Sequence, residues 1–192
     1  SMAKKISDEL KKAILEMPER EKDKLLIRLV SKDYTLMAKL QRQLLEDEVE
    51  MEQRRDEIMQ QMEDTFSRDG FAFWTHTPGL VMMVMRDFSG DINKHVKITR
   101  DKYGEIVLLI RLVNMPFREQ YAILDENQHR AGKFAAYACR KAQIVFDKLK
   151  KFNRDYYLDF ETEVNEMLKH LQSYPPSEKL MGEYGLPQRW EI

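Results

Sequence analysis

Apolar and charged positions recur with helical spacing along residues 128–154. Wound at about 100° per residue, this segment separates into an apolar side and a basic side, and it would form a rod of about 40 Å. Asp125 and Gln128 match a capping-box pattern at its start. The apolar side consists of Ala131, Phe134, Ala135, Ala138, Cys139, Ala142, Val145, Phe146, Leu149 and Phe152. An apolar stripe of this length predicts a partner surface along the whole helix.

The first third of the chain shows the same periodicity in four shorter segments. Pro18 separates the first two, and Asp33 is placed to cap the third. The connections are short, which favours antiparallel neighbours. The four predicted helices are residues 6–17, residues 19–31, a helix that follows Asp33, and a helix that ends at Phe66.

The remaining segments predict three more helices around the long one. One begins at Pro78, one spans about Glu105 to Asn114 and ends before Pro116, and one follows Asp159. The prediction is an all-α protein of about eight helices, arranged as an antiparallel array of helical hairpins. Such an array is either a short α-solenoid or an irregular bundle.

This pattern also predicts the domain organisation. Residues 2–174 form a single all-α domain with a sub-boundary near 67–78, and residues 175–192 form a polar C-terminal tail. The segment 70–80 is rich in aromatic residues and is expected to wedge against a core. One alternative changes the fold class, because residues 95–113 contain β-branched positions around a turn-like Asp101–Gly104. A small hairpin there would make the protein α+β.

One hexapeptide occurs twice in the chain. Residues 25–30 and residues 108–113 both read Leu-Leu-Ile-Arg-Leu-Val, at an offset of 83 residues. A decayed duplication of two helical hairpins would produce this offset, and so would chance similarity between two buried helices. The central arginines, Arg28 and Arg111, either extend to the surface over apolar neighbours or form an equivalent pair of anion-binding groups.

The amino-acid composition favours a helical protein, and the distribution of charge along the chain suggests where a partner could bind. Charged residues make up 34% of the chain and net charge is −1, with only 7 Gly and 6 Pro. The charge is unevenly placed, because residues 67–150 hold 14 Lys and Arg against 9 Asp and Glu, whereas acids exceed bases on both sides. The basic middle either pairs with the acidic ends inside the molecule or faces a partner.

The basic side of the long segment is the main candidate binding surface. It combines cations with an aromatic ring, which suits an acidic peptide or a phosphate backbone. We therefore expect a non-catalytic helical interaction module that binds an acidic protein partner. The alternatives are a nucleic-acid-binding protein that uses the same stripe, or a solvated face paired with the N-terminal helices. The stripe consists of Arg130, Lys133, Tyr137, Arg140, Lys148, Lys151 and Arg154.

A second candidate site lies in the polar segment before the turn of the alternative hairpin. Asp91 and His95 are four residues apart and would share one helix face, where a carboxylate can orient an imidazole for acid–base chemistry. Arg100 could clamp an anion there. This arrangement predicts either an enzyme centred on Asp91 and His95 or a surface ion pair.

The chain lacks the motifs of the common catalytic and cofactor-binding folds. No Walker loop, dinucleotide-binding glycine motif, nucleophile elbow or His-Glu-x-x-His motif occurs, so no cofactor and no metal is predicted. Cys139 is the only cysteine and excludes an intrachain disulfide. No apolar run is long enough to cross a membrane, and we expect a soluble cytoplasmic protein. The sequence leaves the oligomeric state and the identity of the partner open.

Overall fold

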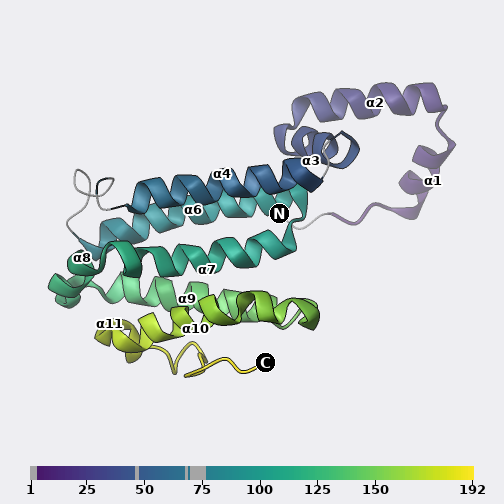
Figure 1. Ribbon diagram of the computed structural model, residues 1–192. Helices are drawn as coiled ribbons and strands as arrows, with labels where there is room; N and C mark the ends of the chain where they lie inside the picture. Colours follow the sequence, from purple (N-terminus) through teal and green to yellow (C-terminus); the bar gives the residue numbers. More distant parts are fainter. Residues whose placement is uncertain (1–3, 46–47, 68, 70–76) are drawn as a thin grey trace. The chain divides into compact units, whose positions relative to one another are not determined.

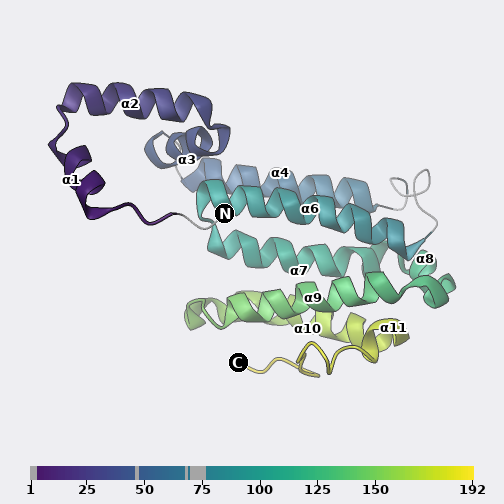
Figure 2. The ribbon, with the colours of Figure 1, turned by 180° about the vertical axis from the view of Figure 1, so that it is seen from behind.

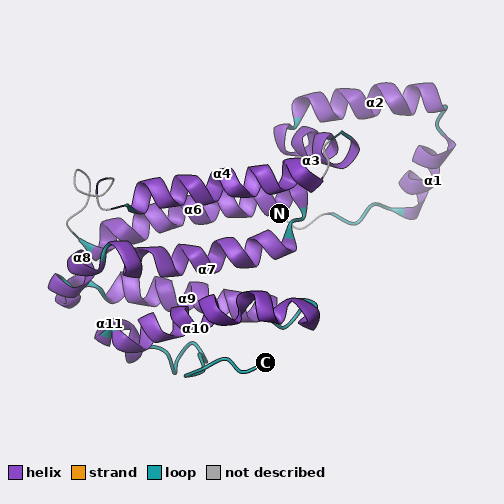
Figure 3. Ribbon diagram, viewed as in Figure 1, coloured by secondary structure: helices purple, strands orange, loops and turns teal. Residues whose placement is uncertain are grey.

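Helices account for all regular secondary structure in the described part of the chain. The computed structural model describes residues 4–45, 48–67, 69 and 77–192, and these residues contain helices and loops but no strand (Figure 3). The all-α prediction is confirmed. Most of the aromatic segment expected to wedge against a core, residues 70–76, lies outside the described residues.

The alternative hairpin around residues 95–113 is wrong. This region is the end of α6 (Pro78–Thr99) and the start of α7 (Lys102–Glu119). The break between them is a tight connection in which Arg100 adopts the left-handed conformation, with φ 58°. The β-branched residues are buried between helices, and burial decides their conformation more strongly than their strand preference does.

Intramolecular contacts group the chain into two units, Ser1–Glu46 and Asp47–Ile192. We call them the N-terminal unit and the C-terminal unit. The division between them precedes the sub-boundary that the sequence suggested near 67–78, and that segment belongs to the C-terminal unit. The prediction of one domain over 2–174 therefore spans both units.

Three helices make up the N-terminal unit: α1 (Asp8–Glu16), α2 (Glu19–Lys32) and α3 (Tyr34–Leu44). Asp33 caps α3 as predicted, because its Oδ1 accepts a hydrogen bond from the Leu36 backbone N–H at 3.0 Å. No residue of these three helices is buried. The unit thus has no core of its own among the described residues.

The C-terminal unit is an irregular bundle built around α7. Its long helices run side by side in both ribbon views (Figures 1 and 2). The helix α7 packs against all four of the others, whereas a solenoid helix would contact only its neighbours in the stack. The other helices are α4 (Glu48–Phe66), α6, α9 (Gly132–Leu149) and α10 (Tyr157–Ser173), with the short α8 (Tyr121–Glu126) and α11 (Pro175–Glu178).

Burial on every side explains why α7 is apolar almost all round. Leu108, Ile110 and Leu112 are fully buried, and Leu109 and Val113 are 2% exposed or less. The helix also continues to Glu119, so the predicted end before Pro116 is wrong. Proline removes one backbone hydrogen bond, but burial of its neighbours Met115 and Phe117 offsets that loss.

The long segment 128–154 is shorter as a helix than predicted. The helix α9 begins at Gly132, and residues 128–130 and 154–156 form separate 3₁₀ turns, η1 (Gln128–Arg130) and η2 (Arg154–Tyr156). The preceding helix ends at Asn127, because the side-chain amide of Asn127 donates a hydrogen bond to the Ile123 carbonyl at 2.8 Å. This bond competes with the backbone hydrogen bonds that would continue the helix.

Residues 175–192, predicted as a polar tail, pack on the C-terminal unit. Met181 and Leu186 are buried, and the Trp190 ring lies 5.1 Å from that of Tyr157. The Asn165 side chain accepts a hydrogen bond from the Trp190 N–H at 2.8 Å and donates one to its carbonyl at 3.1 Å. The tail is therefore held to α9 and α10.

The repeated hexapeptide provides a matched test of this packing. Ile110→Ala should lower the free energy of unfolding of the C-terminal unit by about 2–5 kcal/mol, because it removes fully buried methyl groups. Ile27→Ala, at the equivalent position of the repeat, should change it by less than about 0.5 kcal/mol, because Ile27 is 70% exposed in the other unit. Urea unfolding followed by near-UV circular dichroism measures both, and equal losses would contradict the assignment of α7 as the core helix.

Candidate functional site

The predicted basic stripe extends over three elements of the C-terminal unit. Its members are Arg130 on η1, then Lys133, Tyr137, Arg140 and Lys148 on α9, then Lys151 in the following turn and Arg154 on η2. All the cations except Lys148 are exposed, and Tyr137 is half-buried. Although α9 is shorter than the predicted helix, most of the stripe is therefore still on the surface.

Only one cation of the stripe is neutralised by a described carboxylate. The Lys148 ammonium lies 2.9 Å from Glu105, a buried residue of α7. Arg140 donates to the Gln143 side-chain oxygen at 2.7 Å, which leaves its charge uncompensated. Among the described residues, the other cations of the stripe form no ion pair within the unit. Internal pairing with acidic helices thus accounts for Lys148 but not for the rest of the stripe.

Lys141, which the sequence pattern did not single out, lies beside this stripe and is half-buried. Its ammonium donates to the Ser89 hydroxyl of α6 at 2.7 Å and lies 5.3 Å from the centre of the Tyr137 ring. Burial lowers the pKa of Lys141, and the positive charges of Arg140 and Lys148 lower it further. No described carboxylate pairs with it, so the cation depends on weak neutral contacts.

Tyr137 connects this lysine to a further cation on α6. Burial raises the pKa of the Tyr137 hydroxyl, while a hydrogen bond from Ser89 and the positive charge of Arg86 act in the opposite direction. The two helices thus bring together a surface that we call the α6–α9 cationic face. It consists of Arg86, Tyr137, Arg140, Lys141 and Lys148.

A cavity of about 420 Å³ lies where the C-terminal end of α9 meets the start of α7. Lys102, Lys148 and Lys151 line it together with Glu105 and the ring of Phe152. Lys148 is paired with Glu105, and the exposed Asp147 also lines the cavity, so its three lysines exceed its two carboxylates by one charge. The cavity extends the cationic face in a concave form.

The second candidate site is arranged differently from the predicted pair. His95 is buried and its Nε2 lies 2.9 Å from Oδ2 of Asp101, whereas Asp91 and Arg100 are exposed. Asp91 and His95 do share α6, but the partner of the imidazole comes from the α6–α7 connection. The structure therefore does not gather Asp91, His95 and Arg100 into one site.

Asp101 is the centre of a buried ion cluster that sequence reasoning missed. Arg55 of α4 donates to both carboxylate oxygens, at 2.9 and 3.0 Å, and the Gly104 backbone N–H donates at 2.9 Å. Burial alone would raise the pKa of Asp101, but the hydrogen bonds from His95, Arg55 and Gly104 hold it well below its usual range. A Cβ at Gly104 would overlap both the carboxylate and the guanidinium, so the glycine permits this close approach.

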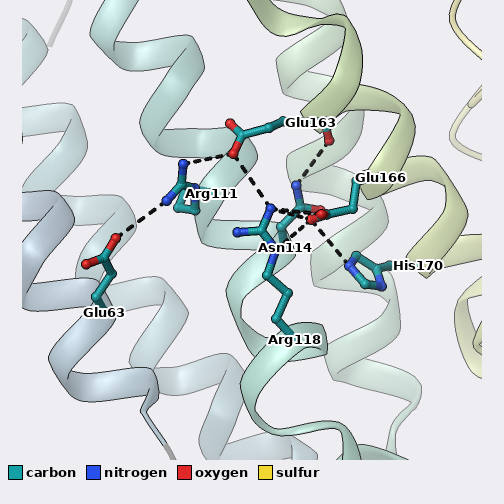
Figure 4. Close-up of polar contacts among 7 residues, drawn as sticks. All are labelled: Glu63, Arg111, Asn114, Arg118, Glu163, Glu166 and His170. Carbon is teal, nitrogen blue, oxygen red and sulfur yellow. Dashed lines mark hydrogen bonds and ion pairs between the residues drawn. The ribbon is translucent and has the colours of Figure 1, made fainter.

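A third polar cluster connects α4 and α10 to α7 (Figure 4). Arg111, the arginine of the second hexapeptide, donates to Glu163 at 2.8 Å and to Glu63 at 3.5 Å. Two turns further along α7, Arg118 forms a bidentate contact with Glu166 at 2.7 and 2.9 Å. The charge of Arg111 is thus neutralised by glutamates of α4 and α10. The spacing of residues within α7 could not reveal these partners.

The same cluster includes a histidine that is held in its neutral form by its surroundings. The His170 ring stacks on Phe117 with the ring centres 5.2 Å apart and the planes at 7°. Burial lowers the pKa of His170, and the nearby Glu166 carboxylate opposes that effect in part. These contacts hold α10 against α7 and assign the cluster a structural role.

The described residues contain no group of three or more His, Cys, Asp or Glu side chains placed to hold a metal ion. No described helix is both long enough and apolar enough to cross a membrane. Comparison with protein-family models, curated protein sequences and solved structures finds no match for this chain. The argument for function therefore rests on the arrangement of these side chains.

Removing the buried carboxylate tests the Asp101 cluster. Asp101→Asn should lower the free energy of unfolding at pH 7 by about 3–5 kcal/mol, because it leaves the Arg55 charge partly buried and unpaired. Asp91→Asn is the matched control, since Asp91 is exposed, and should have little effect. Urea titrations of the three proteins measure these differences.

The pH dependence of that difference follows from the lowered pKa. A carboxylate with a folded-state pKa below its unfolded value of about 3.9 stabilises the fold above that pH, and the contribution disappears as pH falls towards the folded pKa. The gap between wild type and Asp101→Asn should therefore be constant from pH 7 to about 5 and shrink below about 4. A gap that stays constant down to pH 2.5 would contradict the assignment.

Proposed function

We propose that this protein is a non-catalytic helical interaction module that binds an acidic protein segment through the α6–α9 cationic face. The single observation that carries the proposal is Lys141, a half-buried ammonium with no described carboxylate partner. Structural lysines at such depth are normally paired, because burial of an unpaired charge is unfavourable. An acidic side chain of a partner would supply the missing counter-charge.

The surroundings of Lys141 suit a carboxylate ligand. Arg86 is close enough to Tyr137, and Arg140 close enough to Lys141, to lower the pKa of that side chain, so a bound acid would meet positive charge from two helices. The Ser89 hydroxyl, which is buried, accepts a hydrogen bond from Lys141 and holds the ammonium in position. Fixed cations of this kind chiefly increase the rate and the specificity of association.

The extended form of the face favours an acidic peptide over a single small anion. The 18 residues of α9 span about 27 Å, and the exposed stripe cations continue beyond both helix ends. The 420 Å³ cavity beside Lys102 and Lys151 offers a second place for an acidic side chain along the same line. A segment with several acids would therefore contact separate cations in sequence.

A nucleic acid is the alternative ligand for the same surface. Its phosphates would also compensate Lys141, but the whole chain has a net charge of −1, which weakens long-range attraction to a polyanion. The enzyme hypothesis has less support from the geometry, because His95 is buried and both oxygens of its partner Asp101 already accept hydrogen bonds. We therefore propose the acidic protein segment as the ligand.

Charge reversal at two cations of the face and at the neighbouring stripe residue Lys133 tests this proposal. The triple variant Lys133→Glu, Arg140→Glu and Lys141→Glu should weaken binding of a fluorescent 20-residue poly-glutamate peptide at least 10-fold at low salt, because three cations become repulsive. Fluorescence anisotropy measures the affinity. The matched control reverses three exposed cations elsewhere in the same unit, Lys169, Lys179 and Arg189, and changes the net charge by the same amount.

The outcomes separate this proposal from its alternative. Equal weakening by both triple variants would mean that net charge rather than the face governs binding, and the proposal would be abandoned. Preferential binding of a 20-nucleotide oligothymidine, with an affinity that falls steeply and log-linearly as salt rises, would replace the acidic protein with a nucleic acid. Circular dichroism of each variant checks that helix content is retained.

A further inference from the structure

The N-terminal unit exposes many large apolar side chains on its surface. Eleven large apolar side chains are between 39% and 80% exposed: Ile6, Leu10, Ile14, Leu15, Leu26, Ile27, Leu29, Tyr34, Met37, Leu44 and Leu45. Together they correspond to roughly 1,000 Å² of apolar surface, taking on the order of 100 Å² for each such side chain. This exceeds the few hundred Å² that a monomeric soluble protein usually exposes in one patch.

The repeated hexapeptide shows what kind of surroundings such residues occupy when they are packed. In α7, Leu109, Ile110 and Leu112 are at most 2% exposed. The equivalent positions of α2, Leu26, Ile27 and Leu29, are 51–70% exposed. The same hexapeptide thus forms a core face in α7, whereas in α2 the other helices of the N-terminal unit leave this face uncovered.

A groove between α2 and α3 is the concave part of this surface. Its volume is about 500 Å³ and its lining is almost wholly apolar. We call it the α2–α3 groove, and it is lined by Leu26, Ile27, Val30, Ser31, Met37, Leu40, Gln41, Leu44 and Leu45. Along α3 the lining from Met37 to Leu45 spans about 12 Å.

The helix α1 supplies a complementary convex surface. It is amphipathic, its nine residues span about 13 Å, and Leu10 and Ile14 lie on its exposed apolar face. Among the described residues it packs extensively against no other helix. Met17 and Pro18 are both extended, with ψ 143° and 137°, so α1 and α2 are separate helices.

Charge supports the same pairing. The nine residues of α1 contain three acids and two lysines, whereas residues 19–45 contain seven Lys and Arg against four acids. An acidic helix beside a basic helix pair gains favourable electrostatic contacts around an apolar centre.

We propose that the N-terminal unit is a homodimerisation surface in which α1 of each chain lies in the α2–α3 groove of a second copy. Each chain provides one helix and one groove, so the contact closes with twofold symmetry and covers both uncovered surfaces at once. The seven exposed apolar side chains that this contact would cover, Leu10 and Ile14 on α1 and Leu26, Ile27, Met37, Leu44 and Leu45 in the groove, correspond to roughly 700 Å² on each chain, close to the approximately 800 Å² per partner of a stable interface. This inference is independent of the cationic face on the C-terminal unit.

Analytical ultracentrifugation of the full chain between 1 and 100 µM tests the dimer. We expect a concentration-dependent dimer, and we expect Leu10→Asp with Ile14→Asp to raise its dissociation constant at least 10-fold, because two apolar contacts become charged. Leu158→Asp is the matched control, since Leu158 is 75% exposed on α10 of the C-terminal unit. A monomer at 100 µM, or equal weakening by the control, overturns the proposal.

Crosslinking between two differently tagged chains tests whether α1 of one chain lies in the groove of the other. This test remains valid even if α1 no longer folds as a helix in the double aspartate variant. One chain carries Ala13→Cys on α1 and the other carries Ser31→Cys in the groove, while the native Cys139 is fully buried. A short bis-maleimide should join the two chains into a covalent heterodimer. Crosslinking only within a single chain that carries both substitutions would show that α1 closes on its own groove, and absence of both products would assign the groove to another occupant; either result overturns the proposal.

Discussion

Burial of α7 on all sides is the constraint from which the C-terminal unit is organised. A helix that is apolar almost all round must be enclosed by other elements, and four helices supply the enclosure. The same burial carries the helix through Pro116, where local preference alone would have ended it. The surrounding helices can then keep their polar sides towards solvent, which makes an external binding face available.

The polar side chains of α7 show how such an enclosed helix tolerates charge. Arg111 and Arg118 meet glutamates from α10, and Arg111 also reaches Glu63 of α4. At the other end of the helix, Asp101 and Glu105 are buried but are paired with Arg55 and Lys148. Nearly every buried charge in this unit thus has a partner, as the cost of desolvation requires.

Lys141 differs from these paired charges, because no described carboxylate lies beside its ammonium. This difference is the reason why the proposed function rests on Lys141. The half-buried Arg55, Arg111 and Lys148 face carboxylates, whereas Lys141 meets a hydroxyl and an aromatic ring. The N-terminal unit presents the analogous exception for apolar groups, since α2 leaves uncovered the same hexapeptide that α7 buries. Lys141 has no described carboxylate as a counter-charge. The apolar face of α2 has no covering helix within the N-terminal unit.

The sequence by itself determined the all-α class, the cap at Asp33, and the presence of a basic stripe beside an apolar one on α9. These depend on local spacing and side-chain type, which helical periodicity makes readable. It could not determine that His95 binds Asp101 rather than Asp91, that Arg111 binds Glu163, or that Ser89 binds Lys141. Those contacts join residues of different elements, some separated by about 50 positions. The tertiary structure alone also decided that α7 continues through Pro116, because burial outweighs local preference by several kcal/mol.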